Sequence, residues 1–296
     1  MKVVTYNIHY AVGKDLRYDI ERIVDAVRDA DIIALQEVER NYGPGRQCQP
    51  EVISGLLPDY YWVYGAAFDI DASTKDSLGK VCNRRKQHGQ MILSRSPILT
   101  RRYFPLPRLG IDHTCNLQMG VLEGLVDAPW APLRVYAVHF GSVESRERQE
   151  QAHYLRRLVN EVPTRGGAWT GPAEAHADRD WSDGAKPCPM PVDAIILGDF
   201  NMAPDTPEYQ LVTSDDPIDG SSGFIDARSC ESEPGGSPTW SPLPNRSDEF
   251  RNSMRLDYCF VTSSLSQRIE ASWIDSEASG SDHQPVWLTL GNHVLP

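Results

Sequence analysis

The chain has 296 residues, of which 29 are Lys or Arg and 41 are Asp or Glu, so its formal net charge is −12. This acidic balance argues against tight, non-specific binding of duplex DNA, which relies on Lys and Arg to displace counterions, but it leaves room for a local basic site. The apolar fraction of 40% is too high for a disordered chain and sufficient for a substantial core.

The sequence contains no recognisable signal peptide and no run that approaches the roughly 18 apolar residues of a membrane span. The six cysteines are scattered and form no CxxC pair, which favours reduced thiols over a zinc or redox motif. We therefore expect a cytoplasmic protein without a transmembrane segment.

The N-terminal part predicts a strand, a helix and a second strand. Residues 2–8 are rich in β-branched and aromatic side chains. Residues 19–30 place apolar side chains on one helix face, with the first residue as N-cap. The apolar run at 32–35 suits a strand buried on both faces. Asn7 and Glu37 are predicted at the C-terminal ends of the two strands, where ligands bind in layered α/β folds.

The rest of the chain continues this pattern. We expect a charged helix over residues 144–160 and strands over the runs 91–93, 133–140, 194–197, 256–261 and 285–290. Residues 163–191, rich in Gly, Pro, Ala and Asp, predict a long loop or insertion, in which Trp169 and Trp181 suit packing, a lid or a membrane contact. No linker separates the halves, so we expect a single domain over residues 1–296.

Polar residues mark the predicted strand ends. They supply carboxylates, amides and imidazoles, and there is no Ser or Cys in a nucleophile elbow. Hard oxygen ligands such as Glu37 and Asp282 suit Mg²⁺ or Mn²⁺, and histidines beside such a metal suit water activation and stabilisation of phosphoryl oxygens. The pattern predicts metal-assisted hydrolysis of a phosphoester by the set Asn7, Glu37, His139, Asp199, Asn201, Asp257, Asp282 and His283.

Seven short blocks, in order along nearly the whole chain, resemble the endonuclease/exonuclease/phosphatase superfamily. This superfamily includes DNase I-like and exonuclease III-like nucleases, sphingomyelinases and inositol phosphatases. The blocks are TYNIH (5–9), LQEV (35–38), GQMILSRSP (89–97), VHF (138–140), GDFN (198–201), RLDY (255–258) and SDH (281–283). The resemblance implies an α/β, DNase I-like four-layer sandwich, in which helices flank two mixed β-sheets and the site lies at one edge of the sheets.

The resemblance also implies roles for the matched residues. Glu37 would be the principal metal ligand, Asn7 would help to hold the metal or the phosphate, and Asp282 would bind metal directly or through water. The catalytic residues would be His139, Asp199, Asn201, Asp257 and His283. Among them, Asp257 would orient His283 at the scissile phosphate, and His139 would donate to a phosphate oxygen. The number of metals, one or two, and the choice of Asp199 or His283 as base stay open.

Two features lie outside the shared pattern. Exonuclease III-like nucleases carry Asp where His9 stands, so His9 is either a contact to phosphate or metal or a structural residue. The basic island, the run Arg84-Arg85-Lys86, has two interpretations. It is either a positively charged entrance to the site that attracts an anionic substrate, with Arg84 and Arg85 as contacts, or an ordinary solvated loop. We take residues 41–51, 69–88, 105–116 and 163–191 as the loops that carry specificity.

From these observations we expect a divalent-metal-dependent phosphodiesterase or phosphatase. Mg²⁺, or Mn²⁺ in its place, would be the cofactor, and an activated water would attack the phosphorus of a small or lipid-linked phosphoester. The alternative is a nuclease that acts on DNA or RNA with the same machinery, although the acidic charge disfavours a long duplex. A catalytically silent binding module is a third possibility, against which the intact residue set counts.

Overall fold

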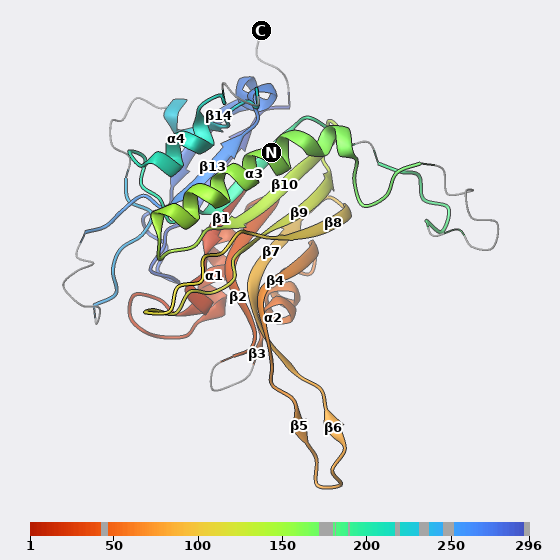
Figure 1. The fold of residues 1–296 in the computed structure, drawn as a ribbon, viewed down its shortest axis with the longest axis vertical. Helices are drawn as coiled ribbons and strands as arrows, with labels where there is room; N and C mark the ends of the chain where they lie inside the picture. The colour runs from red at the N-terminus through yellow and green to blue at the C-terminus, as the bar shows by residue number, and fades with distance from the viewer. Residues whose placement is uncertain are drawn as a thin grey trace.

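The computed structural model describes residues 1–42, 47–171, 180, 182–188, 190–216, 220–230, 237–244 and 252–292. Two β-sheets lie face to face in it, and helices cover their outer sides (Figure 1). In each sheet one parallel pair of strands sits among antiparallel neighbours, β1 with β2 in the first sheet and β10 with β11 in the second. The predicted sandwich of two mixed sheets is confirmed.

The first sheet has the strand order β14-β15-β1-β2-β7-β4, and β3 pairs with β2. Its strands are β1 (Lys2–Asn7), β2 (Ile32–Tyr42), β3 (Gln47–Cys48), β4 (Tyr61–Asp71), β7 (Arg85–Ser94), β14 (Ile269–Ile274) and β15 (Val286–Leu290). Helices α1 (Ile20–Val27) and α2 (Gln49–Leu56) pack on its outer face. Asp19 caps α1, because its side chain accepts from two backbone N–H groups of the first turn.

The second sheet has the order β12-β13-β11-β10-β9-β8. Its strands are β8 (Ile98–Pro105), β9 (Gly120–Asp127), β10 (Pro132–His139), β11 (Ala194–Asp199), β12 (Ile225–Asp226) and β13 (Asp257–Val261). Helices α3 (Ser145–Arg165) and α4 (Pro207–Thr213) pack on its outer face. A third apolar cluster fills the space between the two sheets. Short 3₁₀ turns, η1 (His9–Ala11), η3 (Ala227–Cys230) and η5 (Ser263–Arg268), complete the elements.

A buried ionic network ties the second sheet to the end of α3. Glu123 on β9 is 1% exposed and accepts two hydrogen bonds from Arg102, at 2.7 and 2.9 Å, and one from the Tyr136 hydroxyl at 2.7 Å. Arg134 donates to the same hydroxyl and to the carbonyl of Val159 on α3. These bonds offset the desolvation of the buried charges.

Three boundaries differ from the sequence prediction. The strand predicted at 32–35 continues to Tyr42, so Glu37 does not stand at a strand end. Residues 69–88 are not a loop, because they pair as the outer parts of β4 and β7 and as the hairpin of β5 (Thr74–Lys75) and β6 (Val81–Cys82). The helix predicted over 144–160 continues to Arg165, beyond Pro163.

The predicted insertion at 163–191 is described only in part. Trp169 is partly buried, whereas Trp181 lies outside the described residues. None of the helices in the described part of the chain has the length and apolarity that a membrane crossing requires. The described cysteines Cys48, Cys82, Cys115, Cys188 and Cys259 are free thiols.

Candidate active site

Strand register brings three of the predicted residues side by side. His139 is the Cα partner of Asp199 across the parallel pair β10 and β11, and Asp199 is in turn the partner of Asp257 on β13. The backbone of β11 approaches β10 closely at Gly198, where an added Cβ would lie 1.9 Å from the Val138 carbonyl oxygen. This contact explains the glycine of the GDFN block, since any side chain there would push the two strands apart.

A β-bulge turns Glu37 toward the same edge. The pairing of β2 with β7 changes register between Leu35 and Val38, and Glu37 has a left-handed backbone conformation with φ of 59°. Such bulges insert an unpaired residue that re-aims a side chain without ending the strand. The site therefore receives Glu37 from the middle of β2.

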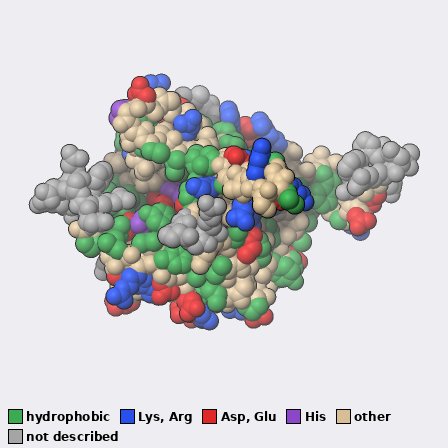
Figure 2. Space-filling view, turned by 90° about the horizontal axis from the view of Figure 1, so that it is seen from below, with side chains coloured by type: hydrophobic (Ala, Val, Ile, Leu, Met, Phe, Trp, Pro, Cys, Tyr) green, Lys and Arg blue, Asp and Glu red, His purple; other side chains and the backbone are tan. Residues whose placement is uncertain are grey.

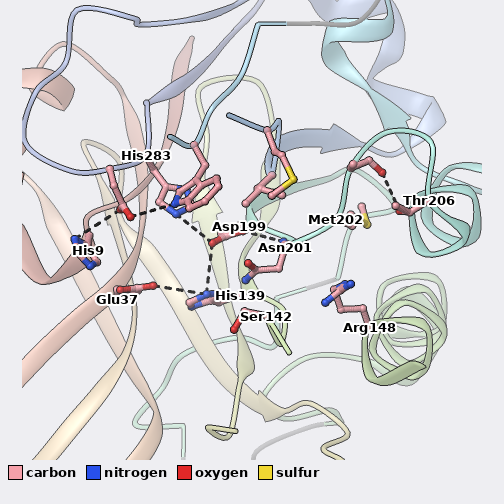
Figure 3. A pocket seen from close by; sticks show the side chains of 15 residues that line it. His9, Glu37, His139, Ser142, Arg148, Asp199, Asn201, Met202, Thr206 and His283 are labelled. Carbon is pink, nitrogen blue, oxygen red and sulfur yellow. Dashed lines mark hydrogen bonds and ion pairs between the residues drawn. The ribbon is translucent and has the colours of Figure 1, made fainter. Parts of the chain in front are cut away.

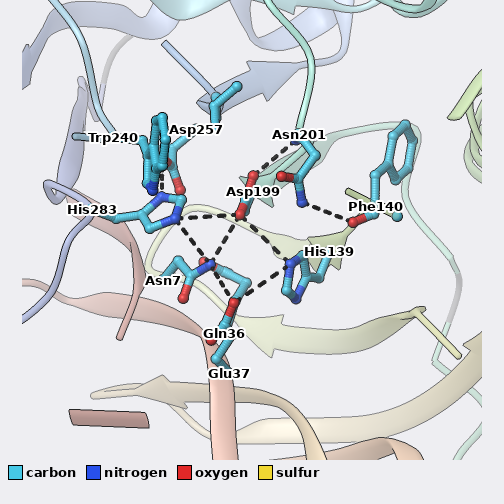
Figure 4. Close-up of polar contacts among 12 residues, drawn as sticks. Asn7, Gln36, Glu37, His139, Phe140, Asp199, Asn201, Trp240, Asp257 and His283 are labelled. Carbon is cyan, nitrogen blue, oxygen red and sulfur yellow. Dashed lines mark hydrogen bonds and ion pairs between the residues drawn. The ribbon is translucent and has the colours of Figure 1, made fainter. Parts of the chain in front are cut away.

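Asp199 lies at the centre of the assembled site (Figure 4). Its Oδ2 accepts a hydrogen bond from Asn7 Nδ2 at 2.9 Å, and it lies 3.6 Å from His139 Nε2 and 3.7 Å from His283 Nε2. Asn7 Nδ2 also donates to Glu37 Oε1 at 3.1 Å. One amide nitrogen on β1 thus connects carboxylates that belong to the two different sheets.

Asn7 presents its amide nitrogen, and not its oxygen, to these carboxylates. Its Oδ1 accepts from the backbone N–H of His9 at 3.0 Å, which fixes the orientation of the amide. An amide oxygen has two lone pairs, so Oδ1 keeps one of them after this hydrogen bond. In this orientation Asn7 aligns Glu37 and Asp199, and the contact to metal or phosphate that the resemblance implied stays a prediction.

His283 and Asp257 form a buried pair. His283 Nδ1 donates to Asp257 Oδ2 at 2.8 Å, and the two residues are 6% and 0% exposed. Asp257 does not pair with Arg255, which donates to Asp226 at 2.8 Å instead. Thr239 supports this segment, since its hydroxyl oxygen accepts from the backbone N–H of Asp257 at 3.0 Å. The pair leaves His283 Nε2 directed toward Asp199.

Asn201 continues the turn after β11. Its backbone N–H donates to Asp199 Oδ1 at 2.8 Å, and its side chain donates to the Phe140 carbonyl at 3.0 Å. Its φ of 48° lies in the left-handed region, which Asn tolerates better than most residues. Asn201 therefore holds the Asp199 carboxylate in place and lines the cleft beside it.

His9 and Asp282 form the other side of the site. His9 Nδ1 lies 3.1 Å from the Val12 carbonyl oxygen and 3.7 Å from Asp282 Oδ1. Asp282 Oδ2 accepts from the indole N–H of Trp240 at 3.1 Å. If Nδ1 carries the proton, it donates to Val12 and leaves His9 Nε2 as an acceptor.

Burial and neighbouring charges shift the titratable groups in different directions. Burial raises the pKa of Glu37, but the surrounding histidines, His139 above all, outweigh it and bring that pKa to about 2. Burial lowers the pKa of His139 to about 4 and raises that of Asp199 to about 7. Burial also lowers the pKa of His283, but the carboxylates of Asp257 and Asp199 outweigh it and raise the value to about 10. At neutral pH, Glu37 is ionised, His139 is neutral and His283 is charged.

These groups line one cleft with a volume of about 360 Å³ (Figure 3). Its polar lining residues include His9, Glu37, His139, Asp199, Asn201, Asp282 and His283, and its apolar lining residues are Met202, Ala203, Trp240, Met254 and Leu256. Ser142 and Thr206 also line it. Arg148 on α3 reaches the same cleft and donates to Glu208 at 2.9 Å and to the Gly141 carbonyl at 3.2 Å.

Two of the predicted contacts lie elsewhere. Neither Arg84 nor Arg85 lines the cleft, because Arg85 begins β7 at the end that leaves the sheet and Arg84 lies just before it. The sequence reasoning missed Trp240, which no motif marked, and His88, whose ring centroid lies 6.4 Å from that of His139. The alternation of side chains along β7, which puts His88 on the same face as Gln90, is the signal that would have found it.

Glu37 and Asp282 are the donors in this cleft that suit a hard divalent cation. Both are carboxylates that line it, and Glu37 is ionised at neutral pH. Among the described residues, a tighter group of potential ligand atoms is Asp199, Asp257 and His283, whose atoms lie within 4.8 Å of one another. Because His283 already donates to Asp257, an ion within that group would have to displace a short buried hydrogen bond.

Comparisons with known proteins agree with this architecture. A family model described as "Endonuclease/Exonuclease/phosphatase family" matches residues 4–283. An endonuclease/exonuclease/phosphatase from Beutenbergia cavernae has a TM-score of 0.64 at 22% identity, covering 98% of this chain and 72% of that one. The mannosyl-6-phosphatase of Bacteroides thetaiotaomicron has a TM-score of 0.61 at 18% identity, covering 98% and 99%.

A 3′ phosphatase from Neisseria, bound to a product DNA hairpin, has a TM-score of 0.54 at 17% identity and covers 98% of this chain and 99% of its own. At these identities the structural likeness establishes a shared fold. No curated protein matches the chain significantly.

Proposed function

The chain belongs to the endonuclease/exonuclease/phosphatase family, and from this membership we propose that it is a divalent-metal-dependent phosphoester hydrolase. The observation that carries the proposal is the contact of one buried carboxylate, Asp199, with groups from both sheets. Asn7 and Asn201 hold that carboxylate, and the imidazoles of His139 and His283 flank it. This arrangement can take a proton from water and stabilise charge on a phosphate.

Asp199 is the proposed general base. A base works best with a pKa near the operating pH, and burial raises the pKa of Asp199 to about 7. His283 is charged at that pH, because the Asp257 and Asp199 carboxylates outweigh burial and raise its pKa to about 10. It therefore has no free lone pair with which to accept the proton of the attacking water.

The two histidines are proposed to contact the phosphate instead. His283 would donate from Nε2 to a phosphate oxygen, with its charge maintained by Asp257 at 2.8 Å. His139, neutral at pH 7 because burial lowers its pKa to about 4, would donate a single N–H to another oxygen. Asn201 would orient the phosphate or the attacking water from the turn after β11.

Glu37 and Asp282 are the proposed metal ligands. They would hold Mg²⁺, or Mn²⁺ in its place, with water and the substrate phosphate completing the coordination. A bound divalent cation supplies Lewis-acid stabilisation of the negative charge on the phosphoryl oxygens. Asn7 aligns the Glu37 carboxylate for this role, because its amide nitrogen donates to Glu37 at 3.1 Å.

The proposed substrate is a small or lipid-linked phosphoester. The cleft volume of about 360 Å³ suits a small group, and the apolar residues in its lining, such as Met202 and Leu256, suit an apolar part of the leaving group. A nuclease is the second candidate. The structural similarity to a Neisseria 3′ phosphatase bound to DNA favours a nuclease, whereas the net charge of −12 disfavours a long duplex as substrate.

Hydrolysis of bis-p-nitrophenyl phosphate, with and without Mg²⁺ or Mn²⁺, tests this proposal. We expect turnover only with metal, lost in Asp199→Asn and in His283→Gln while thermal unfolding stays close to that of the parent protein. A panel of sugar phosphates, sphingomyelin, phosphoinositides and plasmid DNA then separates the two candidates. An absence of turnover with every metal and every ester would refute the hydrolase and favour a binding module.

A further inference from the structure

A two-stranded ribbon, which we define as residues 69–87, projects from the first sheet beside the cleft. It consists of the outer ends of β4 and β7 and the hairpin β5–β6. Figure 1 places it at the bottom of the molecule, and Figure 2, which looks from that side, shows Lys and Arg side chains on it. Five Lys or Arg residues stand there against three Asp, so the ribbon is basic in an acidic chain.

Strand pairing gives the ribbon two different faces. Asp69 pairs with Gln87 and Asp71 pairs with Arg85, so these four side chains share one face. On that face Arg85 Nε donates to Asp69 at 2.7 Å, and Arg85 Nη1 lies 3.7 Å from Asp71. Gln87 donates to the other Asp69 oxygen at 3.0 Å. The positive charge of this face is therefore neutralised.

The opposite face of β7 leads out of the core and past the cleft. Ile92 packs between the two sheets, and Gln90 donates to a backbone carbonyl of β9 at 3.1 Å. His88, two residues further along, brings its ring to 6.4 Å from that of His139 in the site. Because alternate residues of a strand share a face, position 86 comes next on this side, and position 84 lies just before β7 begins. They carry Lys86 and Arg84.

These two cations line a pocket of about 260 Å³ on the ribbon. Asn41, Ala72, Ser73 and Thr74 line it with them, and so does Asp71, whose Oδ1 accepts from the Ser73 hydroxyl at 2.7 Å. Among the described residues, neither Arg84 nor Lys86 forms an ion pair. Lys86 Nζ instead lies over the Tyr42 ring, 5.6 Å from its centroid. Two cations that form no ion pair among the described residues, beside hydroxyl and amide groups and against the single carboxylate of Asp71, make a site for an anion.

We propose that Arg84 and Lys86 form a second phosphate subsite, which holds a phosphate group of the substrate other than the one being hydrolysed. The proposal rests on the hydrolysis proposed for the cleft. A strand advances about 3.3 Å per residue, so Lys86 lies roughly 7 Å from His88 along β7, and Arg84 lies further out, just before the strand begins. The substrate class is therefore a phosphoester that carries a second phosphate several bonds away, as in a nucleoside bisphosphate, a short oligonucleotide or a polyphosphorylated sugar.

This assignment divides the basic island of the sequence. Arg84 and Lys86 line the pocket, whereas Arg85, between them, does not line it and donates to Asp69. Arg85 is thus a matched control, because it lies on the same strand and carries the same charge. Substitution of any of the three exposed or partly exposed side chains leaves the core packing untouched.

A pair of chromogenic esters tests the subsite. Thymidine 5′-(p-nitrophenyl phosphate) and its 3′-phosphorylated form share the leaving group and the nucleoside and differ by one phosphate. We expect the parent protein, at about 0.05 M salt, to favour the 3′-phosphorylated ester in kcat/KM by at least about tenfold. The double variant Arg84→Ala/Lys86→Ala should reduce that preference to about one, and Arg85→Ala should keep it.

A binding measurement separates this proposal from the catalytic one. Calorimetric titration with thymidine 3′,5′-bisphosphate and with thymidine 5′-monophosphate should give the same preference, lost in the double variant, even if neither ester is hydrolysed. Competition by inositol hexakisphosphate, but not by an oligothymidylate, would place the second phosphate on a sugar. Competition by the oligothymidylate, but not by inositol hexakisphosphate, would place it on a nucleotide chain. Equal affinity for the two thymidine ligands, or loss of the preference in Arg85→Ala as well, would overturn the subsite.

Discussion

Replacing Asp257 with Asn should move the alkaline limb of the pH–rate profile by about three pH units. Asp257 Oδ2 accepts from His283 Nδ1 at 2.8 Å, and both side chains are buried. Unit charges roughly 4 Å apart interact by about 4 kcal/mol at an effective dielectric constant of about 20, which corresponds to about three pKa units. Asn keeps an acceptor oxygen for the imidazole but removes the charge. The pKa of His283 should therefore fall from about 10 toward about 7.

The consequence is largest above neutral pH. If the charged His283 donates to the phosphate, the fraction of active enzyme at about pH 8.5 should drop to about one part in thirty in Asp257→Asn. The profile of kcat/KM for bis-p-nitrophenyl phosphate with saturating Mn²⁺, between about pH 5.5 and pH 10.5, measures this shift. The parent protein should give a bell whose limbs lie near the pKa values of Asp199, about 7, and His283, about 10.

The result that would refute this reasoning is a uniform loss of rate with an unchanged alkaline limb. In that case Asp257 would orient the imidazole without setting its charge. A limb that moves upward would contradict the sign of the interaction. Thermal unfolding of the variant checks that the change reflects His283 and not a loss of folded protein.

Three further predictions test other parts of the structure. Glu37→Gln should weaken Mn²⁺ binding at least about tenfold in calorimetry, and an unchanged affinity would assign the ion to other residues. EDTA should abolish turnover, and excess Mg²⁺ should restore it, whereas full activity in EDTA would remove the metal from the proposal. Glu123→Ala should lower the free energy of unfolding in urea by about 1–3 kcal/mol, because it removes the acceptor of the buried Tyr136 hydroxyl and the carboxylate partner of the partly buried Arg102; a loss below about 0.5 kcal/mol would contradict the importance of that network.

The fold class and most of the site were predictable because their signals are local. Short apolar runs predict the central strands, and the polar residues that end β1, β10 and β11 are the ones that meet at the sheet edge. The register of the parallel pair then sets His139 beside Asp199. The resemblance that the ordered motifs carry also implied that Asp257 orients His283, although the two residues lie 26 positions apart in the sequence.

The misplaced parts depended on relations between strands. Glu37 was expected at a strand end, but the bulge against β7 is a property of two strands and leaves no pattern in one of them. The sequence predicts a loop at residues 69–88, because they lie between the matched blocks and contain no motif. They pair across a ribbon with both faces in contact with solvent, so no alternation of apolar and polar residues was needed.

The sequence by itself determined which chemical groups the protein has, and that they follow buried strands in an α/β chain. Composition, apolar runs and seven short blocks are enough for that, because each depends on neighbours within a few residues. Only the tertiary structure decided what those groups face. The Asn7 amide nitrogen donates to the carboxylates. Arg85 donates to Asp69, whereas Arg84 and Lys86 form no ion pair with a described carboxylate. The physical reason is that a side chain's partner is set by register and by the opposing sheet, which bring together residues far apart in the chain.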